Sequence, residues 1–138
     1  MRSSKREAVL RTAAQVFNEK GYLASTLDEV AERLSVTKPT LYYYVKNKEE
    51  ILFECVRIGL TMLQDAIHEV GASGGSAIDK LTAAMRKYTE IVTMDFGMCV
   101  IRVGEDPLSP DSQVKLRRIK AAIDLEFREL IIQGIAEG

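Results

Sequence analysis

Hydrophobic residues recur every three or four positions along most of the chain, which is the spacing of helices that bury one face. The first such segment covers residues 4–20 and ends at Gly21, because glycine readily adopts the left-handed conformation that closes a helix. Two short segments follow, one from about 27 to 34 and one from residue 38, and each comes directly after a threonine that can cap its first turn. No segment alternates like a half-buried strand, so the sequence predicts an all-α fold.

The second half of the chain continues the helical pattern. A long segment with a wide apolar stripe begins after Asn47 and extends to a break rich in glycine and serine at residues 71–76. Three more helices are expected, over 78–92, over 94–103 and from Pro110 onward, and the second of these is apolar nearly all round, as in a buried helix of a bundle. We expect a three-helix head over residues 1–47 and a helical regulatory body over residues 48–138.

Charge divides the chain at nearly the same place. Residues 1–48 carry nine basic and five acidic side chains, a net charge of +4, so the remainder carries −5 within the total of −1. A basic head on an acidic body is typical of a DNA-binding module joined to a domain that does not touch DNA. The sequence has no apolar run of membrane-spanning length and no secretory leader, so we expect a cytoplasmic protein without a membrane partner. Cys55, Cys99 and the single histidine lack metal-ligand spacing, so two buried thiols are expected, with no disulfide, metal or cofactor.

The two short helices, joined by a tight connection at Ser35 and Val36, have the spacing of a helix-turn-helix. When the second of them advances by about 100° per residue, Leu41 and Val45 share one face, which predicts that both face the core. The opposite face presents Pro39, Thr40 and Tyr43. Such a face can contact thymine methyl groups and base edges in the major groove, while the flanking tyrosines and the lysine that opens the next helix can bond phosphates.

These residues resemble the N-terminal signature of the TetR family. The resemblance covers roughly residues 5–52 and rests on Phe17, Gly21, Tyr22, Thr26, Val30, Ala31, the run from Val36 to Tyr44, and Lys48 with Glu49. It implies base contacts from Thr37, Lys38, Pro39, Thr40 and Tyr43. It implies phosphate contacts from Thr26, Tyr42, Tyr44 and Lys48, with partial core packing as the alternative for Tyr42. Tyr44 and Val45 depart from the histidine and phenylalanine that the family often has there.

The resemblance also implies roles for the body. In this family the later helices form a ligand-binding bundle and a dimer interface, and a bound ligand alters the spacing of two DNA-reading heads. Soft and aromatic side chains on facing helices can surround an apolar ligand, although a filled core is the alternative. On this basis we expect effector contacts from Met62, Tyr88, Phe96, Met98, Cys99 and Phe127, with Arg102 meeting an anionic headgroup or else a salt-bridge partner or solvent. The segment 94–110 resembles family members linked to acyl-CoA and lipid metabolism.

The sequence favours a homodimeric repressor that binds a near-palindromic double-stranded operator and is released by a small hydrophobic or acyl-CoA-like effector. A helical adaptor that does not read DNA is the alternative, although an adaptor has no reason to expose Thr40 and Tyr43 beside Lys48. An enzyme is not expected, because the sequence has neither a cysteine and histidine at workable spacing nor a glycine-rich phosphate loop. Family members continue past the position of Gly138 into helices that usually pair two subunits. We therefore expect a truncated chain or a dimer formed through other surfaces.

Overall fold

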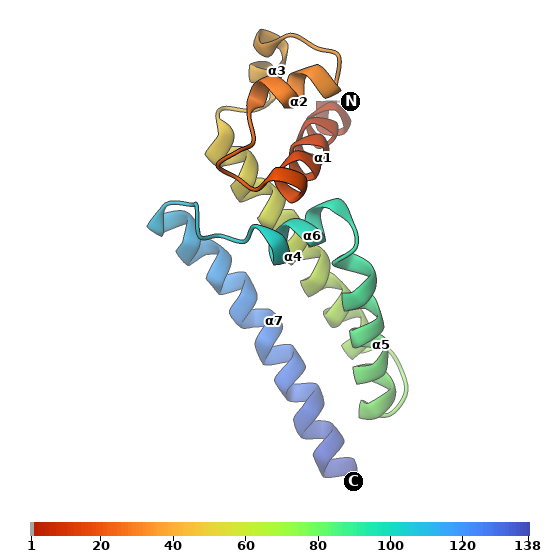
Figure 1. Cartoon of the computed structure of the whole chain (residues 1–138). Coiled ribbons are helices and arrows are strands. Elements are labelled where there is room, and N and C mark those ends of the chain that lie inside the picture. The colour runs from red at the N-terminus through yellow and green to blue at the C-terminus, as the bar shows by residue number, and fades with distance from the viewer. Residues whose placement is uncertain (1) are drawn as a thin grey trace.

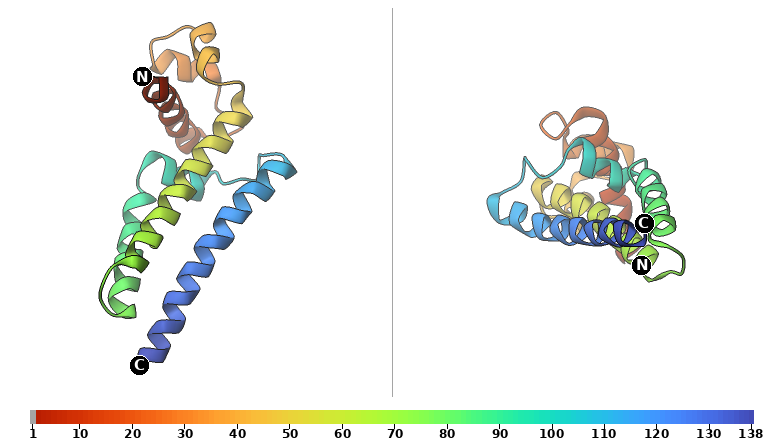
Figure 2. Two further views of the ribbon diagram at one scale, coloured as in Figure 1. Left: turned by 180° about the vertical axis from the view of Figure 1, so that it is seen from behind. Right: turned by 90° about the horizontal axis from the view of Figure 1, so that it is seen from below.

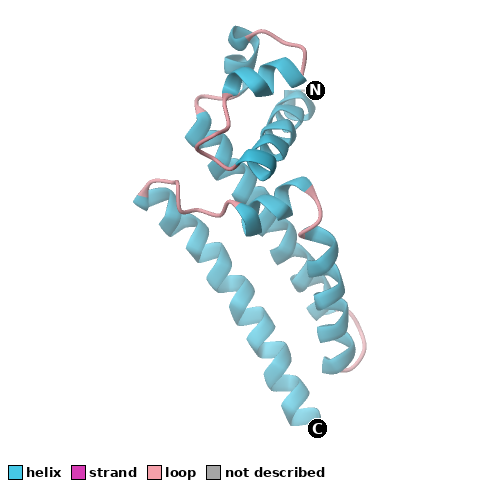
Figure 3. Ribbon diagram, viewed as in Figure 1, coloured by secondary structure: helices cyan, strands magenta, loops and turns pink. Residues whose placement is uncertain are grey.

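A computed structural model describes residues 2–138, with side chains from Ser4 onward, so the expected start of the head at residue 1 lies outside the described residues. Within that range the chain is helices and loops without a strand, which confirms the all-α prediction (Figure 3). The helices are α1 (Arg2–Lys20), α2 (Leu27–Arg33), α3 (Lys38–Tyr44), α4 (Lys48–Ala72), α5 (Ala77–Ile91), α6 (Asp95–Arg102) and α7 (Pro110–Glu137).

Side-chain caps explain where most of these helices begin. The side chains of Thr26, Thr37, Asn47 and Ser109 accept hydrogen bonds from the first turns of α2, α3, α4 and α7, as the sequence predicts. Ser76 and Asp79 form a reciprocal capping box at the start of α5. The long α4 continues through the first two residues of the expected break, and its chain leaves the helix at Ser73.

The molecule is elongated, with the head formed by α1, α2 and α3 at one end (Figure 1). The helix α4 runs from the head down into the body, where α5 and α7 lie along it and α6 crosses it near the junction with α1 (Figures 1 and 2). The two ends of the described chain lie at opposite ends of the molecule (Figure 2). None of the helices in the described part of the chain combines the length and the apolar character that crossing a membrane requires.

The head core is apolar and is completed by the first turns of α4. Phe17 of α1, Leu41 of α3 and Leu52 of α4 are almost fully buried, and all belong to one continuous cluster. The Cys55 thiol on α4 donates a hydrogen bond to the Leu10 carbonyl oxygen on α1, at 3.3 Å. Because α4 also packs against α5, α6 and α7, this one helix belongs to the head and to the body.

Two glycines let α6 approach its neighbours backbone to backbone. A Cβ atom on Gly59 of α4 would lie 2.5 Å from the Phe96 carbonyl oxygen, and one on Gly97 of α6 would lie 1.9 Å from the Ile91 carbonyl oxygen. Real Cβ atoms essentially never come this close to other atoms. The position of α6 therefore depends on the absence of two side chains, which ties it rigidly to α4 and to the end of α5.

Candidate nucleic-acid interface

The turn between α2 and α3 sets the angle of the helix-turn-helix. The chain leaves α2 through Ser35, whose φ of 56° is unusual for a residue other than glycine. The amide of Val36 then donates to the Ala31 carbonyl oxygen at 3.0 Å, and Thr37 is extended before it caps α3. A tightly bonded turn of this kind holds α3 at a fixed angle to α2.

The helical phase predicted for α3 is confirmed. Leu41 and Val45 are 0% and 2% exposed and anchor α3 in the head core. Tyr43 is 72% exposed and Tyr42 48%, so Tyr42 has one half of its surface in solvent and does not pack into the core. The residues on the outward face, namely Thr37, Lys38, Pro39 and Thr40, are all exposed as well. This short helix therefore presents threonine, proline and tyrosine to solvent on a buried aliphatic anchor.

Polar groups at the start of α3 have partners within the head. The Thr37 hydroxyl oxygen accepts a hydrogen bond from the Thr40 amide at 3.3 Å and lies 2.9 Å from the Thr40 hydroxyl. The Lys38 ammonium lies 3.1 Å from an Asp28 carboxylate oxygen, and this hydrogen bond raises the pKa of Lys38. Both partners are well exposed, so an incoming phosphate or base can compete for the lysine at little cost.

Two further residues at the edges of this surface can meet phosphates. Thr26 accepts the Glu29 amide at 3.2 Å through its hydroxyl oxygen, which leaves the hydroxyl proton free to donate. The Lys48 ammonium lies 4.2 Å from the ring centroid of Tyr22, and burial lowers the pKa of this lysine. The Tyr22 ring thus fixes the position of Lys48, a support that the sequence did not reveal.

Tyr44 occupies a different environment from the other two tyrosines. It is half-buried, meets the Tyr43 ring edge to face at a centroid distance of 5.1 Å, and packs on the head core. Its carbonyl oxygen accepts a hydrogen bond from the Arg6 guanidinium at 3.3 Å, and that arginine is also paired with Glu54 at 3.7 Å. These bonds tie the end of α3 to both α1 and α4.

A polar cluster that sequence reasoning missed joins α1 to the first turn of α6. The Asp95 carboxylate accepts a hydrogen bond from Gln15 at 3.1 Å and lies 3.9 Å from the Arg11 guanidinium. The Asp95 carbonyl oxygen accepts a hydrogen bond from Asn18 at 3.0 Å, and Arg102 donates to the Asn18 carbonyl oxygen at 3.3 Å. We name these five residues the α1–α6 clamp.

The residues expected to contact an effector lie on four helices, α4, α5, α6 and α7, and differ in their burial. Phe96 and Cys99 are fully buried on α6, and the Arg11 guanidinium lies 5.0 Å from the centre of the Phe96 ring. Arg102 is exposed and belongs to the α1–α6 clamp, at the junction with the head. The other four expected residues are half-buried, namely Met62 on α4, Tyr88 on α5, Met98 on α6 and Phe127 on α7.

Both cysteines are buried and free, as expected. Burial raises the pKa of the Cys99 thiol to about 12 and that of the Cys55 thiol well above its ordinary value. Thiols in such surroundings stay protonated and behave as small apolar side chains.

Comparison with known proteins places the head in a recognised family. The family described as bacterial regulatory proteins, tetR family, matches residues 9–55. The uncharacterized HTH-type transcriptional regulator YerO of Bacillus subtilis (strain 168) is 31% identical over 140 residues, which cover 99% of this chain and 48% of YerO. The chain spans about half the length of the curated relatives it matches.

Solved structures extend the likeness to the body. The TetR family transcriptional regulator PfmR of Thermus thermophilus superposes with a TM-score of 0.80 at 27% identity, over 94% of this chain and 71% of that one. AibR, solved in complex with isovaleryl coenzyme A and operator DNA, superposes with a TM-score of 0.85 at 23% identity, over 96% of this chain and 73% of that one. The head and the body therefore share the arrangement seen in these regulators.

Proposed function

The chain belongs to the TetR family of bacterial regulatory proteins, and from that premise we propose that it acts as a sequence-specific transcriptional repressor. In this proposal α3 enters the major groove of operator DNA. A small hydrophobic or acyl-CoA-like effector bound to the body then releases the protein from the operator.

The observation that carries the proposal is the exposure of α3. A threonine, a proline and a tyrosine project from a helix whose other face is fully buried, so this face can contact bases without any rearrangement of the core. Base contacts are assigned to Thr37, Lys38, Pro39, Thr40 and Tyr43. Phosphate contacts are assigned to Thr26, Tyr42, Tyr44 and Lys48, of which Tyr44 must reach the backbone from a half-buried position.

Reading a palindromic site requires two heads. Successive major grooves on one face of DNA are about 34–36 Å apart, so we propose a homodimer whose two α3 helices are held at that separation. Residues 48–138 form the regulatory body in this proposal, and residues 1–47 form the reading head.

The α1–α6 clamp offers a route from the body to the head. The close backbone contacts at Gly59 and Gly97 couple the position of α6 to α4 and α5. Asp95, in the first turn of α6, accepts hydrogen bonds from Gln15 and Asn18 of α1. An effector that displaces α6 by an ångström would break these hydrogen bonds and change the tilt of the head. In this proposal the effector contacts Met62, Tyr88, Met98 and Phe127. Phe96, Cys99 and Arg102 lie on α6 as well and contact the effector once α6 is displaced. The complex of AibR with isovaleryl coenzyme A supports an acyl-CoA-like effector.

The experiment that tests the proposal is the selection of bound fragments from a pool of random DNA duplexes. We expect an enriched near-palindrome, bound at least 100-fold more tightly than random duplex at physiological salt, and an affinity that falls steeply as salt increases. Equal affinity for enriched and random duplex would reject the proposal in favour of the adaptor.

A further inference from the structure

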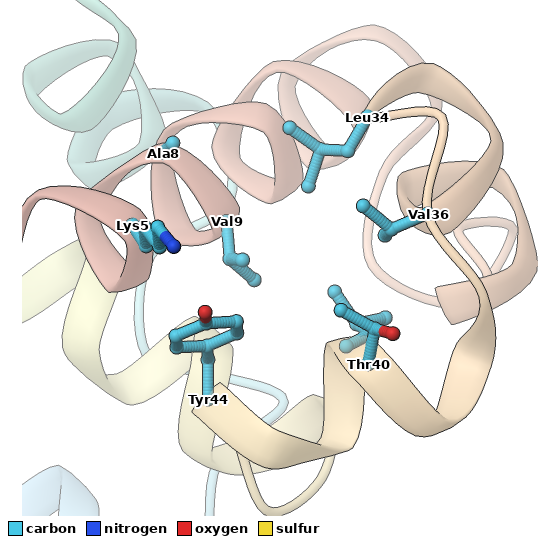
Figure 4. A pocket seen from close by; sticks show the side chains of 8 residues that line it. Lys5, Ala8, Val9, Leu34, Val36, Thr40 and Tyr44 are labelled. Carbon is cyan, nitrogen blue, oxygen red and sulfur yellow. The ribbon is translucent and has the colours of Figure 1, made fainter. Parts of the chain in front are cut away.

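Beyond this proposed function, we propose that the head itself contains a binding site for a small amphipathic carboxylate, separate from the body. The site is a partly open cavity of about 290 Å³ between α1, the turn after α2, and α3 (Figure 4). Its walls are Ala8 and Val9 from α1, Leu34 and Val36 from the turn, and Thr40, Leu41 and Tyr44 from α3, with Lys5 at one side.

The walls of the cavity suit an apolar body of limited size. Val9 and Leu41 are 5% and 0% exposed and form a floor that belongs to the head core. The side chains of Val36 and Tyr44 project into the cavity from opposite sides (Figure 4). A volume near the lower end of ordinary ligand pockets selects a molecule with one ring or a short branched chain.

The charge at the cavity selects an anion. Figure 4 shows the Lys5 ammonium and the Tyr44 hydroxyl directed toward the same space. On the same helix Arg6 is paired with Glu50 and Glu54, whereas Lys5 forms no ion pair with any residue that the structure describes. An ammonium and a phenol proton beside apolar walls complement a carboxylate on a hydrophobic body.

The position of the cavity implies an effect on DNA binding. Thr40 belongs both to the cavity wall and to the outward face of α3. A carboxylate held beside Lys5 would neutralise a positive charge at the edge of the reading surface and place an anion near the phosphates. The occupant would therefore weaken DNA binding directly, without passing through the α1–α6 clamp. This last step rests on the proposed function, while the existence of the site does not.

The test uses 4-isopropylbenzoate as the probe and its neutral amide as the comparison. A probe of about 12 non-hydrogen atoms in a partly open site binds with a dissociation constant on the order of 1 mM or tighter. In amide and methyl NMR spectra of the whole chain, we expect saturable shifts at Leu34, Val36 and Tyr44, with residues of the body such as Phe127 unmoved. The amide should bind about 2–5-fold more weakly, because an exposed ion pair contributes modestly.

Two variants identify the site. Val36→Phe places a ring in the cavity and should weaken probe binding at least tenfold. Val114→Phe, at an exposed position of α7, is the control and should leave probe binding unchanged. Lys5→Gln should abolish the difference between the acid and the amide, and this exposed change does not threaten the fold. Shifts confined to the body, or unaltered binding to a folded Val36→Phe variant, would overturn the proposal.

A second readout connects the site to DNA. In a fluorescence anisotropy titration with duplex DNA, saturating probe should weaken binding severalfold for the wild-type chain and not for Val36→Phe. Shifts in the head of a chain that binds no DNA would leave the ligand site standing and reject the proposed function instead. Shifts in the head with unchanged DNA affinity would reject the regulatory step.

Discussion

Replacing Gly97 with alanine should strongly destabilise the protein, because the added methyl group has no space. Its Cβ atom would lie 1.9 Å from the Ile91 carbonyl oxygen and 2.6 Å from the carbonyl carbon. The first turn of α6 would have to retreat by about 1 Å to reach even a tight contact of 3.0 Å. The Ile91 carbonyl oxygen also accepts a hydrogen bond from the Met94 amide, at 3.0 Å, in the turn between α5 and α6. The retreat of α6 therefore strains that hydrogen bond as well.

The expected magnitude follows from three contributions. Overpacking of a tight core costs about 1–3 kcal/mol and sometimes more, and weakening one hydrogen bond adds about 1 kcal/mol. Alanine regains up to about 1 kcal/mol through its higher helix propensity. We expect a net loss of about 2–3 kcal/mol in the free energy of unfolding, which for a chain of this length lowers the melting temperature by roughly 6–12 °C.

Two other glycines provide matched controls for the same substitution. A Cβ atom on Gly134 of α7 would make ordinary contacts at 3.9 Å, and one on Gly71 of α4 would meet nothing within 4 Å. Gly134→Ala and Gly71→Ala should therefore stabilise the protein by up to about 1 kcal/mol. Urea denaturation followed by circular dichroism measures all three variants. A Gly97→Ala variant as stable as the wild type would refute the rigid placement of α6.

Three further predictions concern the reading surface and the buried thiols. Tyr43→Ala should weaken binding to the selected operator by about 1–3 kcal/mol and should lower the melting temperature only slightly, through the lost contact with the Tyr44 ring. Leu41→Ala should instead cost about 2–5 kcal/mol of stability. The reverse pattern in melts and titrations would show that the face of α3 is wrongly assigned. Lys48→Ala should weaken operator and random duplex alike and reduce the salt slope by about one phosphate, and a loss confined to the operator would contradict a backbone contact. Burial raises the pKa of Cys99 to about 12 and that of Cys55 well above its ordinary value. At pH 8 neither thiol should therefore react with a chromogenic disulfide reagent until the protein unfolds. Rapid release of the reagent's chromophore by the folded protein would contradict the burial of the thiols.

The sequence predicted those features that depend on local rules. The caps at Thr26, Thr37, Asn47 and Ser109 are side-chain bonds across three residues, so a single short window of sequence contains all the information that they need. The orientation of α3 follows in the same way from helical spacing around Leu41.

Features that depend on contacts between distant segments were not predictable in this way. Gln15 and Asp95 are 80 residues apart in sequence, and nothing local marks them as partners. The glycine contacts did leave a signal, since Gly59 and Gly97 both interrupt apolar stretches of a helix, where a missing side chain indicates a close backbone approach. The effector contacts stay a prediction for a related reason, because apolar periodicity identifies buried faces without distinguishing a core from a pocket.

The head is held to the body by two attachments of different kinds. The attachment of α1 to α4 is mainly apolar, as the fully buried Leu52 and Val56 show, so sliding along it would open cavities in a close-packed core. The attachment of α1 to α6 includes exchangeable hydrogen bonds from Gln15 and Asn18, and water can replace such bonds at a modest net cost of about 1 kcal/mol each. A displacement within the body should therefore separate α6 from α1 before it separates α4 from α1. In the proposed mechanism the head would then move as one unit with the first turns of α4, and the hydrogen bonds to Asp95 would hold the head in place until they break.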